Sequence, residues 1–256
     1  MTPTMADRIQ NSPVPTTVVS DAFEAARSIA AEIGAMIDER PDCVLGLATG
    51  HTPIATYSEL VRLHVEEGLS FRGVRTFNLD EYVGLGSTHP GSFEAFMEKH
   101  LFSRVDLLAE NCHLPDARGG ESDCALAAAR YEDRLRELGG LDLLILGIGR
   151  NGHIAFNEPG STRDSRTRMV ELSATTIAAN AADFPIGEEV PERALTMGIA
   201  TILEARRLRV LAFGAHKQTI VRRTLHDPIG PELPATFLRE HDDVELWLDS
   251  AAAADL

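Results

Sequence analysis

Short apolar runs alternate with longer amphipathic stretches along most of the chain. The apolar runs are rich in β-branched residues and leucine, and they lie at 16–19, 44–48, 74–78, 141–146, 208–213 and 244–248. The stretches between them carry apolar residues at helical spacing, and they lie at 21–37, 53–66, 92–101, 121–138 and 216–225. This alternation is typical of a parallel sheet flanked by helices. The sequence therefore predicts an α/β fold with an open, mostly parallel twisted sheet and helices on both faces, in a Rossmann-like arrangement.

Two segments depart from the alternation. Residues 1–15 are polar and contain several prolines, so we expect a flexible tail in front of a single α/β domain that spans residues 16–256. Residues 158–192 are also polar and rich in Thr, Ser, Arg and Ala, although they lie between two apolar runs. A long polar segment at such a place predicts a mobile lid over a binding site.

The charge of the chain limits its partners. With 24 basic and 39 acidic residues, the formal net charge is −15. Nucleic acid and anionic membranes would be repelled over most of such a surface, so neither is expected as a partner. A small anionic ligand would have to be bound by a local group of donors and cations.

The location of the protein is predicted from features that the sequence lacks. No apolar run approaches the roughly 18 residues that cross a bilayer, and residues 1–16 lack the pattern of a signal peptide. We therefore expect a cytoplasmic protein. The three cysteines fit no zinc spacing and are expected to be reduced and structural: Cys43 in a strand, Cys112 in a loop and Cys124 in a helix.

Ligands of open parallel sheets collect at the carboxyl ends of the strands, so the residues directly after each apolar run are the candidate site residues. The first candidate is the turn with Thr49, Gly50, His51, Thr52 and Pro53, which leads directly into a predicted helix. Free backbone N–H groups and the positive end of the helix dipole would favour a phosphate there. An ordinary strand-to-helix turn has a similar composition, and this alternative stays open from the motif alone.

The second candidate is the carboxylate pair Asp80 and Glu81, which follows the run at 74–78. Neighbouring side chains of an extended backbone point to opposite sides, so we expect one carboxylate to face the cleft and the other to support the loop. A carboxylate in a partly dry cleft can act as a base. The alternative is a solvated acidic turn.

The third candidate is the glycine-rich segment 147–160, which follows the most apolar run of the chain. Within it, Glu158 could orient His153 and raise its basicity in a relay. A metal site is a weaker alternative because no further His or Cys completes a ligand set, and a structural histidine is another. The fourth candidate is Lys217, a cation at the start of a predicted helix, where it is unfavourable unless an anion binds. An exposed lysine is the alternative there.

In this order, the four stretches resemble the glucosamine-6-phosphate deaminase family, within the broader group that includes the 6-phosphogluconolactonases. The resemblance covers nearly the whole chain from about Thr16, and its most specific part is the run Gly152 to Ser161. Supporting matches are Thr49 to Pro53, Phe77 to Leu85, Ser165 to Arg168 and Gly214 to Lys217.

The resemblance implies that glucosamine 6-phosphate is isomerised and deaminated to fructose 6-phosphate and ammonia, with no metal and no cofactor. Asp80 would move a proton from C2 to C1 of the opened sugar, and His153, oriented by Glu158 with Asn151 beside it, would assist ring opening. Substrate-binding residues would be Thr49, Gly50, His51, Thr52, Glu81, Gly149 and Lys217, of which the turn 49–52 and the lysine would hold the phosphate.

The expected partner is a small-molecule sugar phosphate, and a homo-oligomer is an open expectation. Three positions depart from the family pattern: Asn151 stands where many members carry Asp, and Ala182 stands where many carry an Arg for the phosphate. Val170 and Glu171 stand where allosterically regulated members place a Lys and a hydroxyl residue, so activation by an amino-sugar effector is expected to be absent or reduced. Two alternatives stay open. One is a sugar-lactone hydrolase of the related branch, which would share the phosphate turn and the Gly-His loop, and the other is a non-catalytic sugar-phosphate sensor, for which Asn151 and Ala182 would be signs of decay.

Overall fold

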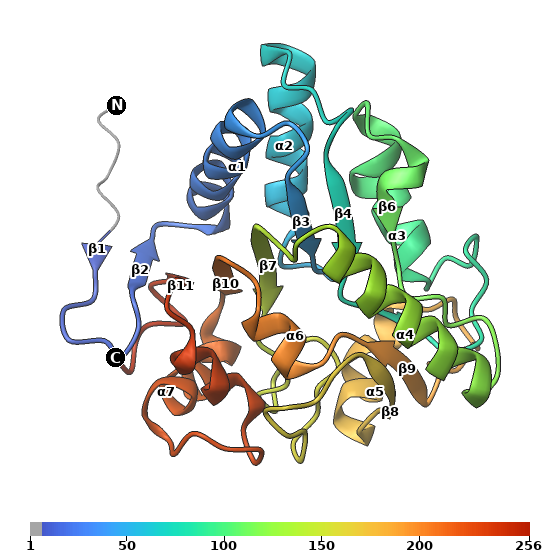
Figure 1. Cartoon of the computed structure of the whole chain (residues 1–256). Helices are drawn as coiled ribbons and strands as arrows, with labels where there is room; N and C mark the ends of the chain where they lie inside the picture. Colours follow the sequence, from blue (N-terminus) through green and yellow to red (C-terminus); the bar gives the residue numbers. More distant parts are fainter. Residues whose placement is uncertain (1–6) are drawn as a thin grey trace.

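A computed structural model describes residues 7–256 of the chain. Its main sheet has eight strands (Figure 1). From one edge to the other, the strands are β1 (Asp7–Arg8), β2 (Thr16–Val19), β11 (Val244–Asp249), β10 (Leu208–Ala212), β7 (Leu143–Gly147), β3 (Val44–Leu47), β4 (Arg75–Asn78) and β6 (Cys112–His113). All neighbours are parallel except β1 and β2.

Helices cover both faces of this sheet. One face packs against α1 (Ala22–Glu39), α2 (Ile54–Glu67) and α3 (Phe93–His100), and the other against α4 (Glu121–Glu137), α6 (Ile199–Leu203), α7 (Gln218–His226) and the 3₁₀ segment η5 (Pro234–Glu240) (Figure 1). Shorter 3₁₀ turns are η1 (Phe102–Arg104), η2 (Ala109–Asn111) and η4 (Ala215–Lys217). The predicted α/β fold is confirmed.

Local sequence explains why α1 forms where it does. The Asp21 side chain accepts hydrogen bonds from the backbone N–H groups of Phe23 and Glu24, which caps the first turn. Ile29, Ile33 and other residues at this spacing are buried against the sheet. Replacing the cap Asp21 by Ala would destabilise the helix by about 1 kcal/mol.

A second, smaller sheet was not expected from the sequence. It is antiparallel and has the order β5 (Asp80–Tyr82), β9 (Arg193–Thr196) and β8 (Arg168–Glu171). Its strands are three or four residues long and partly polar, so they lack the apolar runs that mark the main sheet. The sheet pairs Asp80 with Thr196 and thereby fixes the chain just after β4.

The segment expected to be a lid, residues 158–192, contains β8, helix α5 (Ala174–Asn180) and the 3₁₀ turn η3 (Ala181–Asp183). Toward the end of the segment, the ring of Phe184 packs closely on Gly91. A Cβ atom added to Gly91 would lie only 2.7 Å from the Phe184 ring. The motion of this segment stays a prediction. Of the expected tail, residues 1–6 lie outside the described part, Asp7–Arg8 form β1, and Val14 is buried.

Within residues 7–256, no helix combines the length and the apolar character that crossing a membrane requires. The three cysteines are free thiols: Cys43 precedes β3, Cys124 lies in α4, and Cys112 lies in the short strand β6 and not in a loop.

The order of the strands places a crevice at the carboxyl ends of β3 and β7. These two strands are neighbours, but the chain continues from β3 to β4 on one side and from β7 to β10 on the other. Crossover helices therefore leave in opposite directions, and the loops after both strands separate. Thr49 follows β3, and Ile148 and Gly149 follow β7.

Candidate active site

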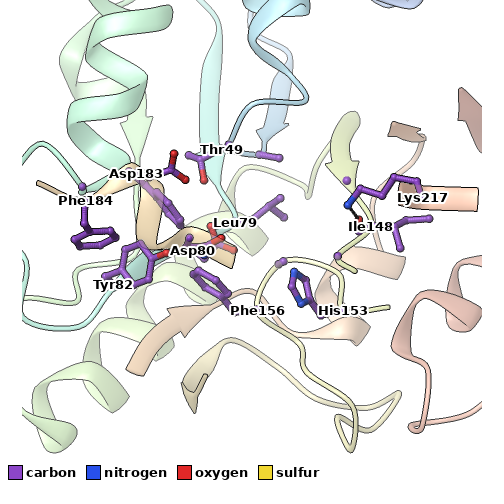
Figure 2. A pocket seen from close by; sticks show the side chains of 18 residues that line it. Thr49, Leu79, Asp80, Tyr82, Ile148, His153, Phe156, Asp183, Phe184 and Lys217 are labelled. Carbon is purple, nitrogen blue, oxygen red and sulfur yellow. Dashed lines mark hydrogen bonds between the residues drawn. The ribbon is translucent and has the colours of Figure 1, made fainter. Parts of the chain in front are cut away.

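A cavity of about 200 Å³ lies at this crevice, and all four candidate stretches contribute to its wall. Thr49, Asp80, His153 and Lys217 each line it (Figure 2). Figure 2 shows Lys217 and His153 at one side of the cavity and the aromatic side chains of Tyr82 and Phe184 at the opposite side. Residues far apart in the sequence thus meet as predicted from the strand ends.

The turn after β3 supplies backbone donors. Thr49 and Gly50 line the cavity, and Gly50 has a φ of 92°, a left-handed conformation that favours glycine. The turn is anchored by buried Tyr57, whose hydroxyl donates to the carbonyl oxygen of Ala48. Thr52 is half-buried and does not line the cavity.

His51 connects this turn to the lid segment. Its side chain is 83% exposed, and its Nε2 lies 3.7 Å from Oδ1 of Asp183 in η3. Asp183 lines the cavity, whereas Ala182, at the position where the resemblance expects an arginine, is exposed beside it. The wall near the turn therefore carries a carboxylate that the sequence did not single out.

Asp80 is the most perturbed acid of the cavity. It is 6% exposed, and among the described residues no group donates a hydrogen bond to its carboxylate. Burial, together with the charge of Glu81, raises the pKa of Asp80 to about 8. A carboxyl group with such a pKa can both take up and release a proton near neutral pH.

Glu81 points away from the cavity and supports α3. Its carboxylate accepts hydrogen bonds from the backbone N–H groups of Tyr82 (2.9 Å), Phe93 (3.0 Å) and Glu94 (3.0 Å). The bonds from Phe93 and Glu94 cap the N-terminus of α3, where a negative charge is favourable. The structure corrects the expected substrate contact: of the two adjacent carboxylates, Asp80 faces the cleft and Glu81 holds the neighbouring helix, because successive side chains of strand β5 alternate.

His153 packs directly against Gly149. A Cβ atom at Gly149 would lie only 2.2 Å from His153 Nε2, so the imidazole occupies space that only glycine leaves free. The backbone closes this turn by the bonds Gly149 N–H to His153 O (2.8 Å) and Gly152 N–H to Gly149 O (3.0 Å). Gly149 thus lines the cavity and makes room for the imidazole.

Glu158 and Asn151 stand behind His153, outside the cavity wall. His153 Nδ1 lies 3.7 Å from Glu158 Oε2, and Asn151 Nδ2 donates to the same oxygen at 2.6 Å. Burial alone would raise the pKa of Glu158, but the neighbouring His153 imidazole, the Thr176 hydroxyl and the Asn151 amide lower it to about 2. Glu158 is therefore a permanent anion beside the histidine.

Lys217 is held in the cavity wall and is not the exposed lysine of the alternative interpretation. Its Nζ donates to the carbonyl oxygen of Ile148 at 2.6 Å. Burial, and secondarily the charge of Arg150, lowers the pKa of Lys217. The ammonium lies across the crevice from the β3 turn, where it can pair with an anion bound between them.

The opposite wall comes from residues that the sequence did not mark. Asn180 of α5 donates to the Tyr82 hydroxyl at 2.7 Å, and the ring centroids of Phe156 and Tyr82 are 5.3 Å apart.

The start of α5 contacts Glu158 instead, because the hydroxyl groups of Ser173 and Thr176 donate to its carboxylate. In the sequence, only the Ser-x-x-Thr spacing of Ser173 and Thr176 marks these two residues, and this spacing is too common at helix starts to indicate a site.

The relay and metal interpretations of His153 can now be compared. Within residues 7–256, no three His, Cys, Asp or Glu side chains converge closely enough to hold a metal ion. The cavity instead combines three features: the buried acid Asp80 with its raised pKa, the His153 imidazole beside the Glu158 carboxylate, and the Lys217 cation near the turn after β3. These features suit proton transfer on a small anionic molecule. The fold and the site thus define an α/β enzyme of acid–base chemistry.

Comparison with known proteins specifies the family. The model of the family described as glucosamine-6-phosphate isomerases/6-phosphogluconolactonase matches residues 20–247, and the chain belongs to this family. It is 49% identical to a glucosamine-6-phosphate deaminase of Rhodopirellula baltica, over 93% of this chain and 94% of that protein. It is 48% identical to glucosamine-6-phosphate deaminase 1 of Giardia intestinalis, over 93% and 90% of the two chains.

Solved structures agree with this assignment. A monomeric glucosamine-6-phosphate deaminase superposes with a TM-score of 0.90 at 42% identity, covering 93% of this chain and 98% of that one. The 6-phosphogluconolactonase of Trypanosoma brucei superposes with a TM-score of 0.75 at 25% identity, covering 94% and 98%. Similarity to the deaminases is thus the greater in both sequence and structure.

Proposed function

We propose that this chain isomerises and deaminates glucosamine 6-phosphate to fructose 6-phosphate and ammonia. Identities of 48–49% to named deaminases over more than nine tenths of the chain support the reaction. The observation that carries the residue roles is that buried Asp80 lines the same cavity as His153 and Lys217. A base, a ring-opening group and an anion site within one cavity are what this chemistry requires.

Phosphate binding is the first step of the proposal. The phosphate would lie between the Lys217 ammonium and the backbone N–H groups of Thr49 and Gly50, near the positive end of α2. His51 would approach it from the rim of the cavity. Anchoring at this end leaves the sugar carbons to reach toward Asp80 and His153.

Ring opening is the second step. His153 would take the proton of the anomeric hydroxyl at Nε2 and return a proton to the ring oxygen, which frees the C1 aldehyde. Glu158 would stabilise the imidazolium that forms in between, because its carboxylate stays ionised. Asn151, a neutral amide, orients Glu158 by a hydrogen bond and adds no charge.

Proton transfer and loss of ammonia complete the reaction. The aldehyde acidifies the C2 hydrogen, which Asp80 would remove as a proton while the C1 oxygen takes up a proton, so that an enolamine forms. Asp80 would then deliver its proton to C1, and loss of one N–H proton leaves an imine at C2. Water then adds to C2, the C–N bond breaks, and the nitrogen leaves as ammonia while the water oxygen becomes the ketose oxygen. The raised pKa of Asp80 suits a group that holds the proton between the two carbons.

The test is ammonia release by the purified protein with glucosamine 6-phosphate, galactosamine 6-phosphate and N-acetylglucosamine 6-phosphate, in parallel with a pH-indicator assay on 6-phosphogluconolactone. The proposal expects ammonia and fructose 6-phosphate from the first substrate. Acid release from the lactone without ammonia would instead assign the related hydrolysis, and thermal stabilisation by the sugar phosphate without turnover would indicate a sensor.

Location and assembly belong to this proposal as well. A cytoplasmic enzyme is consistent with a phosphorylated sugar as substrate. The expectation of a homo-oligomer stays open, because the 42% identical deaminase is described as monomeric. Light scattering of the purified protein decides between a single chain and an oligomer.

A further inference from the structure

We infer that the hydroxyl of Thr176 is the positioning group that connects His153 to Glu158, so that helix α5 determines which imidazole nitrogen carries the proton. This inference rests on the proposed function, since it concerns the ring-opening step. Thr176 lies in the first turn of α5, within the segment expected to be a lid, and its side chain is only 3% exposed.

The direct contact between imidazole and carboxylate is too long for a hydrogen bond. His153 Nδ1 and Glu158 Oε2 are 3.7 Å apart. Thr176 Oγ1 lies 2.5 Å from Glu158 Oε1 and 3.4 Å from His153 Nδ1. The hydrogen-bonded path therefore runs from the imidazole through the hydroxyl to the carboxylate. The long step resembles catalytic hydrogen bonds of ligand-free enzymes, which shorten when substrate binds.

The direction of each bond in this path follows from the charge of Glu158. An ionised carboxylate only accepts hydrogen bonds, so the single hydroxyl proton of Thr176 must point to Glu158. The oxygen of Thr176 then faces His153 with a lone pair. Because both polar neighbours of Nδ1 are acceptors, Nδ1 carries the proton and Nε2 keeps its lone pair.

The unprotonated nitrogen is the one at the cavity. Nδ1 faces Thr176 and Glu158, which do not line the cavity, whereas His153 itself does, so Nε2 on the other edge of the ring faces the cavity. A lone pair at this place can accept a proton from a sugar hydroxyl. The Thr176 hydroxyl thus prepares His153 as a base without contacting the substrate.

No other described group near Glu158 can replace this link. Asn151 Nδ2 donates to Glu158 Oε2 at 2.6 Å, while its Oδ1 accepts from the backbone N–H of His153 at 3.2 Å and does not reach Nδ1. Ser173 donates to Glu158 Oε1 from its N–H (3.2 Å) and hydroxyl (3.1 Å). Both residues hold the carboxylate, and only Thr176 also reaches the imidazole ring.

Because Thr176 belongs to α5, the tautomer of His153 depends on where that helix lies. Ser173 caps α5 by accepting from the Thr176 N–H at 3.2 Å, and Asn180 at the other end donates to the Tyr82 hydroxyl at 2.7 Å. Displacement of α5 would remove the Thr176 hydroxyl from Nδ1 and leave only Glu158, which at 3.7 Å is too far for a hydrogen bond. The position of the lid segment and the tautomer of His153 are thereby connected.

The experiment compares Thr176→Val, which keeps the shape and removes the hydroxyl, with Thr176→Ser, which restores it. Thr175→Val is the matched control, since Thr175 is the exposed neighbour on the same helix. We expect kcat to fall roughly 10- to 100-fold in Thr176→Val, as for other groups that orient a histidine, with little change in KM. Thr176→Ser should recover most of the rate, and Thr175→Val should match the unmodified protein.

Two further measurements separate this role from a structural one. Binding of the reduced open-chain analogue, 2-amino-2-deoxyglucitol 6-phosphate, should be unchanged, because this molecule has no ring to open. If Thr176→Val lowers the melting temperature, ¹⁵N NMR of histidine-labelled protein, assigned with His153→Gln, still reports whether Nδ1 carries the proton.

Each outcome decides the inference. If the unmodified protein releases no ammonia, the proposed function fails and the NMR tautomer alone tests the link. If the unmodified protein is active and Thr176→Val keeps its rate, the inference is wrong while the proposed function stands. Equal losses of rate and of analogue affinity would also overturn it, as would a spectrum in which Nε2 carries the proton.

Discussion

Replacing Asp80 by Asn should abolish ammonia release and at the same time stabilise the protein at neutral and alkaline pH. The side chain is 6% exposed, and burial, with the charge of Glu81, raises its pKa to about 8. Asparagine has the same shape, cannot act as a base, and never needs to ionise. The ionised Asp80 carboxylate that the reaction requires therefore destabilises the folded protein.

The size and the sign of this stability difference follow from the protons that the folded and unfolded states bind. The unfolded chain releases the Asp80 proton near its ordinary pKa of 3.8, whereas the folded protein keeps it until pH 8. Between these values the folded state binds more protons, so this residue makes stability fall as pH rises. The advantage of Asp80→Asn should therefore grow by roughly 2 to 4 kcal/mol from pH 5 to pH 8, the lower figure allowing for water in the cavity.

The assay is urea unfolding of both proteins at pH 5 and pH 8, together with ammonia release. Asp142→Asn is the control, because Asp142 is also buried but accepts from the Val44 N–H at 2.7 Å and pairs with Arg40 and Arg206. That variant should be less stable than the unmodified protein at both pH values. A constant difference between Asp80→Asn and the unmodified protein, or substantial activity of the variant, would refute the reasoning.

Two other variants test the cavity wall. Gly149→Ala should lower kcat about 100-fold, because the new Cβ would lie 2.2 Å from His153 Nε2 and displace the imidazole ring. An unchanged kcat would show that the position of this ring is unimportant. Asp183→Asn should lower KM about two- to fivefold, because a half-exposed carboxylate 3.7 Å from His51 repels the substrate phosphate. Glu188→Gln removes an equal charge from the same segment outside the cavity and should leave KM unchanged, and a higher KM in Asp183→Asn would contradict the expected repulsion.

The main sheet could be predicted because its strands are continuous apolar runs. Each of the six predicted strands is present within about two residues, and the carboxyl ends bring Thr49, Asp80, His153 and Lys217 together. Parallel strands buried on both faces carry this signal in their composition alone. Their shared direction then determines at which edge the polar residues meet.

The small sheet and the lid segment could not be predicted in the same way. Strands β8 and β9 are short and partly polar, and the pairing of β9 with β5 joins residues more than 110 positions apart, such as Asp80 and Thr196. The alternation of side chains along a strand did not by itself decide which of Asp80 and Glu81 faces the cleft. Thr176 gains its importance only from its position beside His153, 23 residues earlier in the chain.

The central claim is that Asp80 removes the hydrogen at C2 of the opened sugar. The most direct measurement follows that hydrogen by ¹H NMR while glucosamine 6-phosphate is incubated in D₂O with the unmodified protein or with Asp80→Asn. We predict that the C2 hydrogen is lost with the unmodified protein and stays in place with the variant, although the variant still binds the substrate. Loss of the C2 hydrogen at a similar rate in the variant would contradict the claim.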